Sequence, residues 1–278
     1  MKGNKARRAA SKWKVFEPAT WEEFLADIDA ARQSLGFHAR EECFFRGHAD
    51  RGWHLLPTLL RYATQNNLSG AETLALEGSL FWEFQARAQE LHHDHLSDWD
   101  YLFFMRHHGV YTRLLDWSEG LGVALYFALE HYRIGPPPGV SQPCVWLLNP
   151  YTLNEHADAW NVRDLVSPRY LGYIAEDDET YDYGGVIDTD LIHWTMPVAI
   201  YPIQRSNRVR AQRGWFTIQG RNPKPLEAQA PANLAQVVLP PAAIGEALRF
   251  LDHAGLNEYT MYADLDSLAR ELHRKNGI

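Results

Sequence analysis

Hydrophobic residues recur at helical spacing through most of the first half of the chain. This spacing predicts one helix from Trp21 to Gly36, a second after Ser69 and a third after Ser97. Thr20 and Ser69 each precede a glutamate by three positions, which is the spacing of a capping box. Short polar residues therefore set the expected starts of all three helices.

The stretch 105–130 concentrates polar and aromatic residues and then becomes an apolar helical pattern. Gly109 is expected to end the preceding helix, because glycine readily adopts the left-handed conformation of a C-terminal cap. Ser118 is expected to cap the apolar helix that follows. The pattern thus predicts a tight segment over 110–117, held between two helices.

Charged and hydroxyl groups accompany these apolar runs. Thr112, Arg113 and Asp116 lie in the tight segment, and one interpretation pairs Arg113 with Asp116 as a buried structural ion pair. Earlier in the chain, a short apolar strand is expected to stop on Arg46. A charge at that place is costly unless it is paired, so a structural pair between Arg46 and Asp116 is a second interpretation. Gly47 beside it would let a backbone or a ligand come close.

The second half of the chain is dominated by short apolar runs, which predict strands. The expected strands are Val145–Leu148, Pro197–Ile203, Trp215–Ile218 and Gln236–Leu239, and the expected closing helices are Pro241–His253 and Asp264–Lys275. The fold class is therefore α+β, with a helical N-terminal half packed on small mixed or antiparallel sheets. A basic arm over 1–12 precedes a single domain over 13–278.

Composition narrows the classes of function. The 278 residues carry a net charge of −8, which argues against broad nonspecific binding to nucleic acid or membranes. Cys43 and Cys144 sit in apolar surroundings and indicate buried free thiols of a cytoplasmic protein. His92 and His95 have a spacing that zinc could use, but a third ligand is not visible and no metal is expected. The acidic stretch 177–182 is interpreted as a solvated loop.

Several motifs resemble the FRG domain family, which is named for a Phe-Arg-Gly motif. The matching residues are Phe45-Arg46-Gly47, the run 112–117 with 124–128, the group Asn207, Arg208, Gln212, Gly214 and Phe216, and the tail 262–269. Two departures bear on what enters a pocket: Tyr111 stands where the family usually has proline, and Arg106 where it tends to have glutamine.

The order of these motifs is also similar to that of ADP-ribosyltransferases, which hold NAD in a cleft between two small sheets. The resemblance implies that Arg46 binds the diphosphate, that Thr112 and Asp116 shape the nicotinamide–ribose pocket, and that Gln212 takes the position of the catalytic acid. The candidate catalytic residues are therefore Arg46, Asp116 and Gln212, and the candidate NAD-binding residues are Arg46, Gly47, Thr112, Arg113 and Arg208.

The leading functional hypothesis is an ADP-ribosyltransferase-like or NAD-consuming enzyme or toxin of the bacterial cytoplasm, with phage defence as one setting and a protein or nucleic acid as acceptor. The first alternative is a noncatalytic module for nucleotide sensing or protein interaction. The second is an RNA-acting protein, in which Arg205, Arg208, Arg210 and Arg213 grip phosphates. Gln212 cannot carry negative charge, which keeps the first alternative open.

Overall fold

The computed structural model describes most of the chain outside several segments. The described ranges are 12–37, 41–89, 96–134, 138–156, 183–188, 195–200 and 214–277. Residues 1–11 of the predicted basic arm, the histidines at 92 and 95, the acidic stretch 177–182 and the arginines between 205 and 213 lie outside them.

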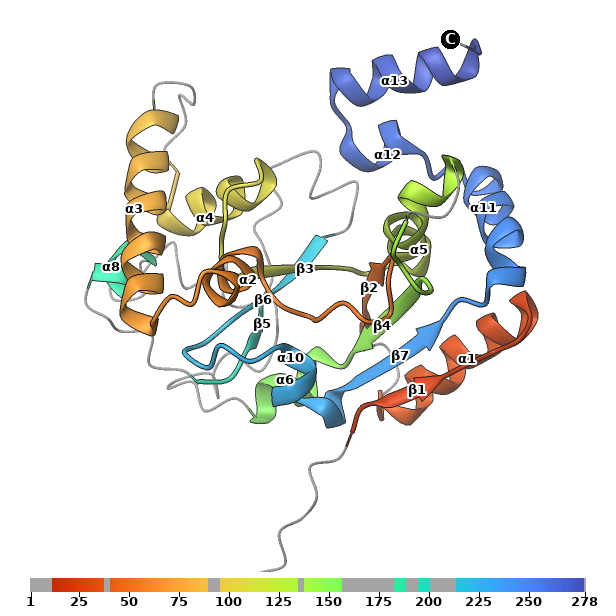
Figure 1. Ribbon diagram of the computed structural model, residues 1–278, viewed down its shortest axis with the longest axis horizontal. Helices are drawn as coiled ribbons and strands as arrows, with labels where there is room; N and C mark the ends of the chain where they lie inside the picture. Colours follow the sequence, from red (N-terminus) through yellow and green to blue (C-terminus); the bar gives the residue numbers. More distant parts are fainter. Residues whose placement is uncertain are drawn as a thin grey trace, which may run out of the picture.

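The described strands form one curled, seven-stranded sheet in the order β1-β7-β4-β2-β3-β6-β5 (Figure 1). The strands are β1 Lys14–Phe16, β2 Phe44–His48, β3 Leu114–Ser118, β4 Cys144–Leu148, β5 Val198–Ile200, β6 Gly214–Ile218 and β7 Leu234–Val238. Only β1 and β7 pair in parallel, and the other described pairs are antiparallel. The expected mixed sheet is confirmed, as one continuous sheet instead of several small ones.

The sheet is weakly joined at its centre. Five residue pairs connect β2 to β4, and five connect β3 to β6. Between β2 and β3 the register contains the single pair Phe45 and Ser118, after which the two strands separate. We call this junction the seam; it divides the sheet into a half containing β1, β7, β4 and β2 and a half containing β3, β6 and β5.

Helices cover the sheet at both ends. The longer ones are α1 Trp21–Ser34, α2 Thr58–Gln65, α3 Gly70–Ala88, α4 Asp98–His107, α5 Leu121–Leu129, α11 Ile244–His253 and α13 Leu265–Lys275. The shorter ones are α6 Pro150–His156, α8 Tyr183–Asp188, α10 Leu226–Gln229, α12 Glu258–Tyr262 and the 3-10 turns η1 Glu130–Ile134, η4 Pro231–Asn233 and η5 Pro241–Ala243. Figure 1 shows α3, α4 and α8 at one end of the sheet and α1, α5 and α11 toward the other.

Cap residues explain several of the helix boundaries. Thr20, Ser69, Ser97 and Asp264 each accept a hydrogen bond from a backbone N–H of the first turn, as their positions predict. Gly109 has φ of +80° directly after α4, so the predicted glycine stop is also confirmed.

The prediction for Ser118 is wrong. This residue ends β3, where it pairs with Phe45, and α5 begins three positions later with Gly120 as its N-cap. Its hydroxyl donates to the carbonyl oxygen of Phe45, so a strand residue uses the side chain that was assigned to a helix cap. The expected tight segment over 110–117 therefore contains most of a strand.

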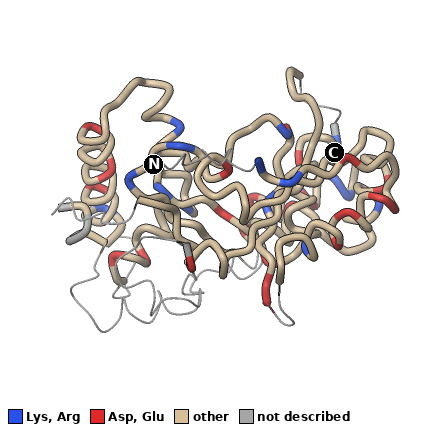
Figure 2. The backbone as a smooth tube through the Cα atoms, turned by 90° about the horizontal axis from the view of Figure 1, so that it is seen from below, with Lys and Arg blue, Asp and Glu red and all other residues tan. Residues whose placement is uncertain are grey.

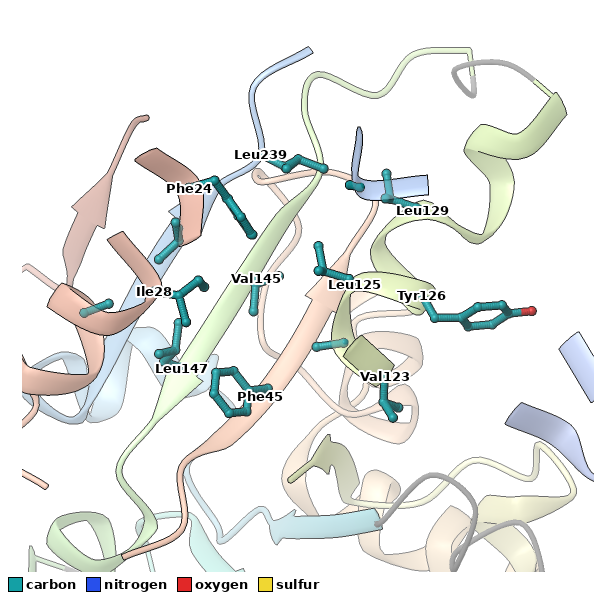
Figure 3. Close-up of a cluster of buried hydrophobic side chains, with 14 of the residues drawn as sticks. Phe24, Ile28, Phe45, Val123, Leu125, Tyr126, Leu129, Val145, Leu147 and Leu239 are labelled. Carbon is teal, nitrogen blue, oxygen red and sulfur yellow. The ribbon is translucent and has the colours of Figure 1, made fainter. Parts of the chain in front are cut away.

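Three clusters of buried apolar side chains surround the sheet. One packs β2, β4 and β7 against α1, α5 and α11, and Figure 3 shows its members Phe24, Phe45, Leu125 and Val145 turned toward one another. A second packs β5 and β6 against α3, α4 and α8. The third lies on the opposite face and draws on both halves of the sheet, including Phe44 of β2 and Trp215 of β6. One face of the sheet thus has two separate cores, and the other has one shared core.

Cys43 and Cys144 are buried free thiols, as predicted. Burial raises the pKa of each thiol to about 12, so both stay protonated at neutral pH. Within the described ranges, no helix is long and apolar enough to cross a membrane.

Candidate functional site

A cavity of about 300 Å³ opens where β2 and β3 separate. Its walls come from β2, β3, α4, α5 and the segment from Ala49 to Arg61, together with Phe216 of β6. The charged and imidazole side chains that line it are Arg46, His48, His54, Arg61, Arg106, His107 and Asp116. The seam therefore gathers residues that are distant in sequence.

Arg46 lies in the middle of β2, because the strand continues past the arginine at which it was expected to stop. Its Nη1 donates to the backbone carbonyl of Asp116 at 2.6 Å and lies 3.7 Å from the carboxylate Oδ2. Its Nε donates to Nε2 of His48 at 3.0 Å. The guanidinium thus bridges the two strands at the place where their backbone pairing has ended.

Asp116 forms its closest ion pair with Arg106 of α4. The Nε of Arg106 donates to both carboxylate oxygens, at 3.0 and 2.9 Å, and its Nη2 donates to Oδ2. Burial would raise the pKa of Asp116, but Arg106, followed by Arg46, outweighs that effect and lowers the pKa below its ordinary value. Asp116 is therefore an ionised carboxylate, and one of the two predicted interpretations, its pairing with Arg46, is observed.

The cavity carries an excess of positive charge. Among the described residues, Arg46, Arg61 and Arg106 line it beside one carboxylate, that of Asp116. Arg61 forms no ion pair with any acidic residue that the structure describes. Burial lowers the pKa of Arg46 to about 10, and the positive charges of Arg106 and Arg61 add to that shift. Cations held this close together favour an anion between them.

His48 and Trp53 complete the wall beside Arg46. Burial, and then the charge of Arg46, hold the pKa of His48 well below its usual range, so its imidazole is neutral. This agrees with its Nε2 accepting the hydrogen bond from Arg46. The ring centroid of Trp53 is 6.1 Å from that of His48, and Trp53 as a whole is 49% exposed, so an aromatic side chain stands at the cavity mouth.

Gly47 is placed where the backbone of α5 crosses β2. A Cβ atom at this position would lie 1.8 Å from the carbonyl oxygen of Ala124 and 2.7 Å from the amide nitrogen of Ala128. The close approach that the glycine predicts is therefore made by the α5 backbone. This contact sets the cavity wall formed by Ala124 and Phe127 beside Arg46.

Comparison with known families finds one match within the chain. The model of the FRG domain matches residues 41–134, the range that contains β2, α2 to α4, β3 and α5. Residues 41–134 are thus similar to the FRG domain, and the match covers less than half of the chain. No curated protein and no solved structure matches the chain. Every described residue that lines the cavity, except Phe216, lies within the matched range. The single FRG-like domain expected over 13–278 extends beyond this match and stays a prediction.

Thr112 and Arg113 lie within the matched range but do not line the cavity. Thr112 is buried, and Arg113 forms a buried ion pair with Glu77 of α3, with its Nε donating to Oε1 at 2.6 Å. Tyr183 of α8 donates its hydroxyl to the same carboxylate. Burial and the charge of Glu77 raise the pKa of this tyrosine well above its ordinary value, so it keeps its proton. The pairing of Arg113 with Asp116, the other interpretation, is not formed.

The remaining sequence candidates are not described. Arg208 and Gln212 lie outside the described ranges, so their roles stay predictions. Within those ranges there is no group of three or more histidine, cysteine or acidic side chains that could hold a metal ion.

From the sequence, Arg106 was named only as a departure that bears on the pocket, and two further contributors to the cavity, Arg61 and His54, were missed. Arg106 had a visible signal, since it stands where the family tends to have glutamine. Arg61 and His54 carried no such signal, because α2 and the segment before it read as an apolar anchor. Figure 2 shows why net charge did not help: basic and acidic residues are interleaved along most of the chain. The positive cluster forms only when the chain folds.

Proposed function

We propose that the cavity at the seam binds the diphosphate of a dinucleotide, with NAD as the substrate, and that the protein is an ADP-ribosyltransferase-like enzyme. The observation that carries the proposal is the cluster of Arg46, Arg61 and Arg106 around one carboxylate at the seam. A guanidinium is planar and offers paired donors that match phosphate oxygens. The cluster therefore suits a ligand with more than one negative group.

The aromatic lining supports a nucleotide over a bare anion. Trp53 stands at the mouth, and Phe103, Phe127 and Phe216 lie along the wall. Aromatic side chains stack on flat rings, and both nucleobases and nicotinamide are flat rings. The resemblance to ADP-ribosyltransferases adds support, because those enzymes hold NAD between two small sheets and this cavity lies between two half-sheets.

In this proposal Arg46 binds the diphosphate, and the nicotinamide–ribose lies beside it in the same cavity. Cleaving the bond between nicotinamide and ribose develops positive charge on the sugar, so preorganised electrostatics contribute more than a strong nucleophile does. Gln212 would hydrogen-bond a ribose hydroxyl from the position of the catalytic acid. The proposed setting is the bacterial cytoplasm, where consuming NAD would make the protein a toxin and phage defence is one use.

One observation favours a second candidate, a noncatalytic nucleotide sensor. Both oxygens of Asp116 are engaged by Arg106, so this carboxylate is not free to accept a proton. An arginine cluster without an available base can bind a nucleotide and leave it intact. The RNA-acting alternative rests on arginines between 205 and 213, outside the described residues, and stays a prediction.

The test compares NAD binding with nicotinamide release. Arg46→Lys keeps the charge but loses the paired donors, so NAD affinity should fall about 10-fold or more, the effect of losing a hydrogen bond to a charged group. The melting temperature should change little. Arg87→Lys is the matched control, because Arg87 pairs with Glu83 on the exposed surface of α3, and it should leave affinity unchanged. Calorimetric titration and chromatography of released nicotinamide give both readings.

Three outcomes decide the matter. NAD that shifts the melting temperature and yields nicotinamide supports the enzyme, and Gln212→Glu should then raise the release by restoring a carboxylate. NAD that binds without release selects the sensor. If NAD neither binds nor is cleaved, the cavity is not an NAD site and both candidates fail for this ligand.

A further inference from the structure

A histidine and a buried glutamate form a dyad at the cavity wall. His54 lines the cavity, and its Nδ1 lies 2.6 Å from Oε1 of Glu227 in α10. The other oxygen of Glu227 accepts the backbone N–H of Leu55 at 3.1 Å. The side chain of Glu227 is 5% exposed, and that of His54 is 71% exposed. A buried carboxylate from a distant part of the chain thus holds an accessible imidazole.

This contact fixes which ring nitrogen of His54 is available. A carboxylate accepts hydrogen bonds and cannot donate them, so Nδ1 carries the proton that points at Glu227. The Nε2 lone pair is then left on the other side of the ring. A carboxylate behind a histidine is the arrangement that orients an imidazole to take a proton from a reacting group.

Two other titratable groups of the wall, Asp116 and His48, are less suited to that task. Asp116 is bound through both oxygens by Arg106. His48 is buried, and its Nε2 already accepts a hydrogen bond from Arg46. His54 combines an oriented ring with exposure to the space that the arginines line.

Resting on the proposed NAD chemistry, we propose that His54 is the general base of this site and that Glu227 is the residue that positions it. The acceptor is a hydroxyl, and water is the simplest one. As its oxygen bonds to C1′ of the ribose, its proton passes to Nε2 of His54. The bond from C1′ to the nicotinamide nitrogen breaks, and its electron pair leaves with nicotinamide. The proton is later lost to solvent, which restores the imidazole.

A purely structural clamp is the competing explanation of the dyad. The segment that carries His54 is joined to α10 without the dyad, because the N–H of Leu226 donates to the carbonyl oxygen of Leu55 at 3.0 Å. Glu227 also holds the N–H of Leu55. His54 can therefore be substituted while both hydrogen bonds to Leu55 remain. An experiment can then separate a role as general base from a role as structural clamp.

The experiment uses the full chain with NAD as the probe and measures three quantities: NAD affinity, melting temperature and nicotinamide release. His54→Gln should keep NAD affinity and melting temperature but lower release about 100-fold, the usual contribution of a general base. Added imidazole should restore part of the release in His54→Ala. His253→Gln is the control, since His253 is an exposed histidine at the end of α11, and should match the parent protein.

Glu227→Gln tests the positioning role. It should lower the turnover number for nicotinamide release without raising KM, because the ring loses its fixed tautomer while the arginines still hold NAD. Full release by His54→Gln would overturn the inference and leave the proposed function standing. If the His54 variants melt at a lower temperature and also release less nicotinamide, and imidazole does not restore release, the dyad is a structural clamp. That result would also overturn the inference. A parent protein that binds NAD without releasing nicotinamide would remove the proposed enzyme and its base together.

Discussion

At the scale of single residues, closeness in sequence is a poor guide to the ion pairs of this protein. Arg113 immediately precedes β3, and Asp116 lies within it. Residues three positions apart in an extended chain point to opposite faces, so the two cannot meet. Arg113 turns toward Glu77 of α3, and Asp116 turns toward Arg106 of α4. Each charge therefore pairs with a residue of a different helix, and the two do not pair with each other.

The buried pair of Arg113 and Glu77 should matter for stability and not for NAD binding. Arg113→Met leaves the carboxylate of Glu77 buried without its cation, which should lower the free energy of unfolding by about 3–5 kcal/mol. Denaturant titration measures this difference. In the control, Arg87→Met breaks an exposed pair on the same helix and should cost less than about 1 kcal/mol.

The double variant Glu77→Leu with Arg113→Met should recover part of the loss, because it removes the unpaired charge as well. Equal losses in Arg113→Met and Arg87→Met would contradict the buried ion pair.

At the scale of elements, the approach of α5 to β2 positions the cavity wall. Gly47→Ala puts a methyl group against the carbonyl oxygen of Ala124, which is backbone and cannot rotate away. The helix must then move off the strand, and we expect a loss of about 1–3 kcal/mol or more in the free energy of unfolding. Thermal and denaturant unfolding give the measurement.

Gly70→Ala is the matched control for this substitution. Gly70 is at the start of α3, and a Cβ atom there would meet no other atom within 4 Å. The control should be neutral or slightly stabilising, since alanine is the better helix former. A Gly47→Ala protein as stable as the control would show that α5 does not pack closely on β2.

The elements also show how far sequence patterns reach. Caps and helical spacing located α1, α3, α4 and α13, because these signals are local. The strand β3 was missed because Leu114 and Leu115 belong to different cores, so both faces are apolar and no alternation marks the strand. The strand β1 was missed because three residues are placed only by their pairing with β7, more than 200 positions later.

The candidate site was predictable to a similar extent. Arg46, Gly47 and Asp116 were found because they lie in motifs, and the structure brings all three to the seam. Arg61, His54 and Glu227 reach the site only through contacts across the fold, and a single sequence contains no sign of them. Local signals therefore found one part of the site, and tertiary contacts supply the other.

At the scale of the whole molecule, the two halves of the sheet are united on one face only. Phe44 of β2 is fully buried, and its ring lies 4.7 Å from that of Trp215 and 6.5 Å from that of Trp117. These contacts cross from one half-sheet to the other. The shared core, and not the single backbone pair of the seam, should make the sheet unfold as one unit.

Phe44→Ala tests this cooperativity. It should lower the free energy of unfolding by about 3–5 kcal/mol and speed amide hydrogen exchange in β4 and β7 as well as in β6. Phe24→Ala is the control, because Phe24 is equally buried but belongs to the core around α1. Its effect on exchange should be greatest in β4 and β7. Faster exchange confined to one half-sheet in Phe44→Ala would mean that the halves are independent.

The carboxylate of Asp116 competes with any anionic ligand for Arg46 and Arg106. An anion that enters meets arginines already engaged by the protein's own negative charge. An anion must then replace Asp116 as the partner of an arginine. Its binding free energy is the difference between the attraction of the arginines to the ligand and their attraction to Asp116. A singly charged ion gains little from such an exchange, whereas a diphosphate can engage Arg61 and displace or share the others. Under the proposed function, the cavity should therefore favour a multiply charged anion over chloride, and this preference arises from charge alone, before the shape of the ligand matters.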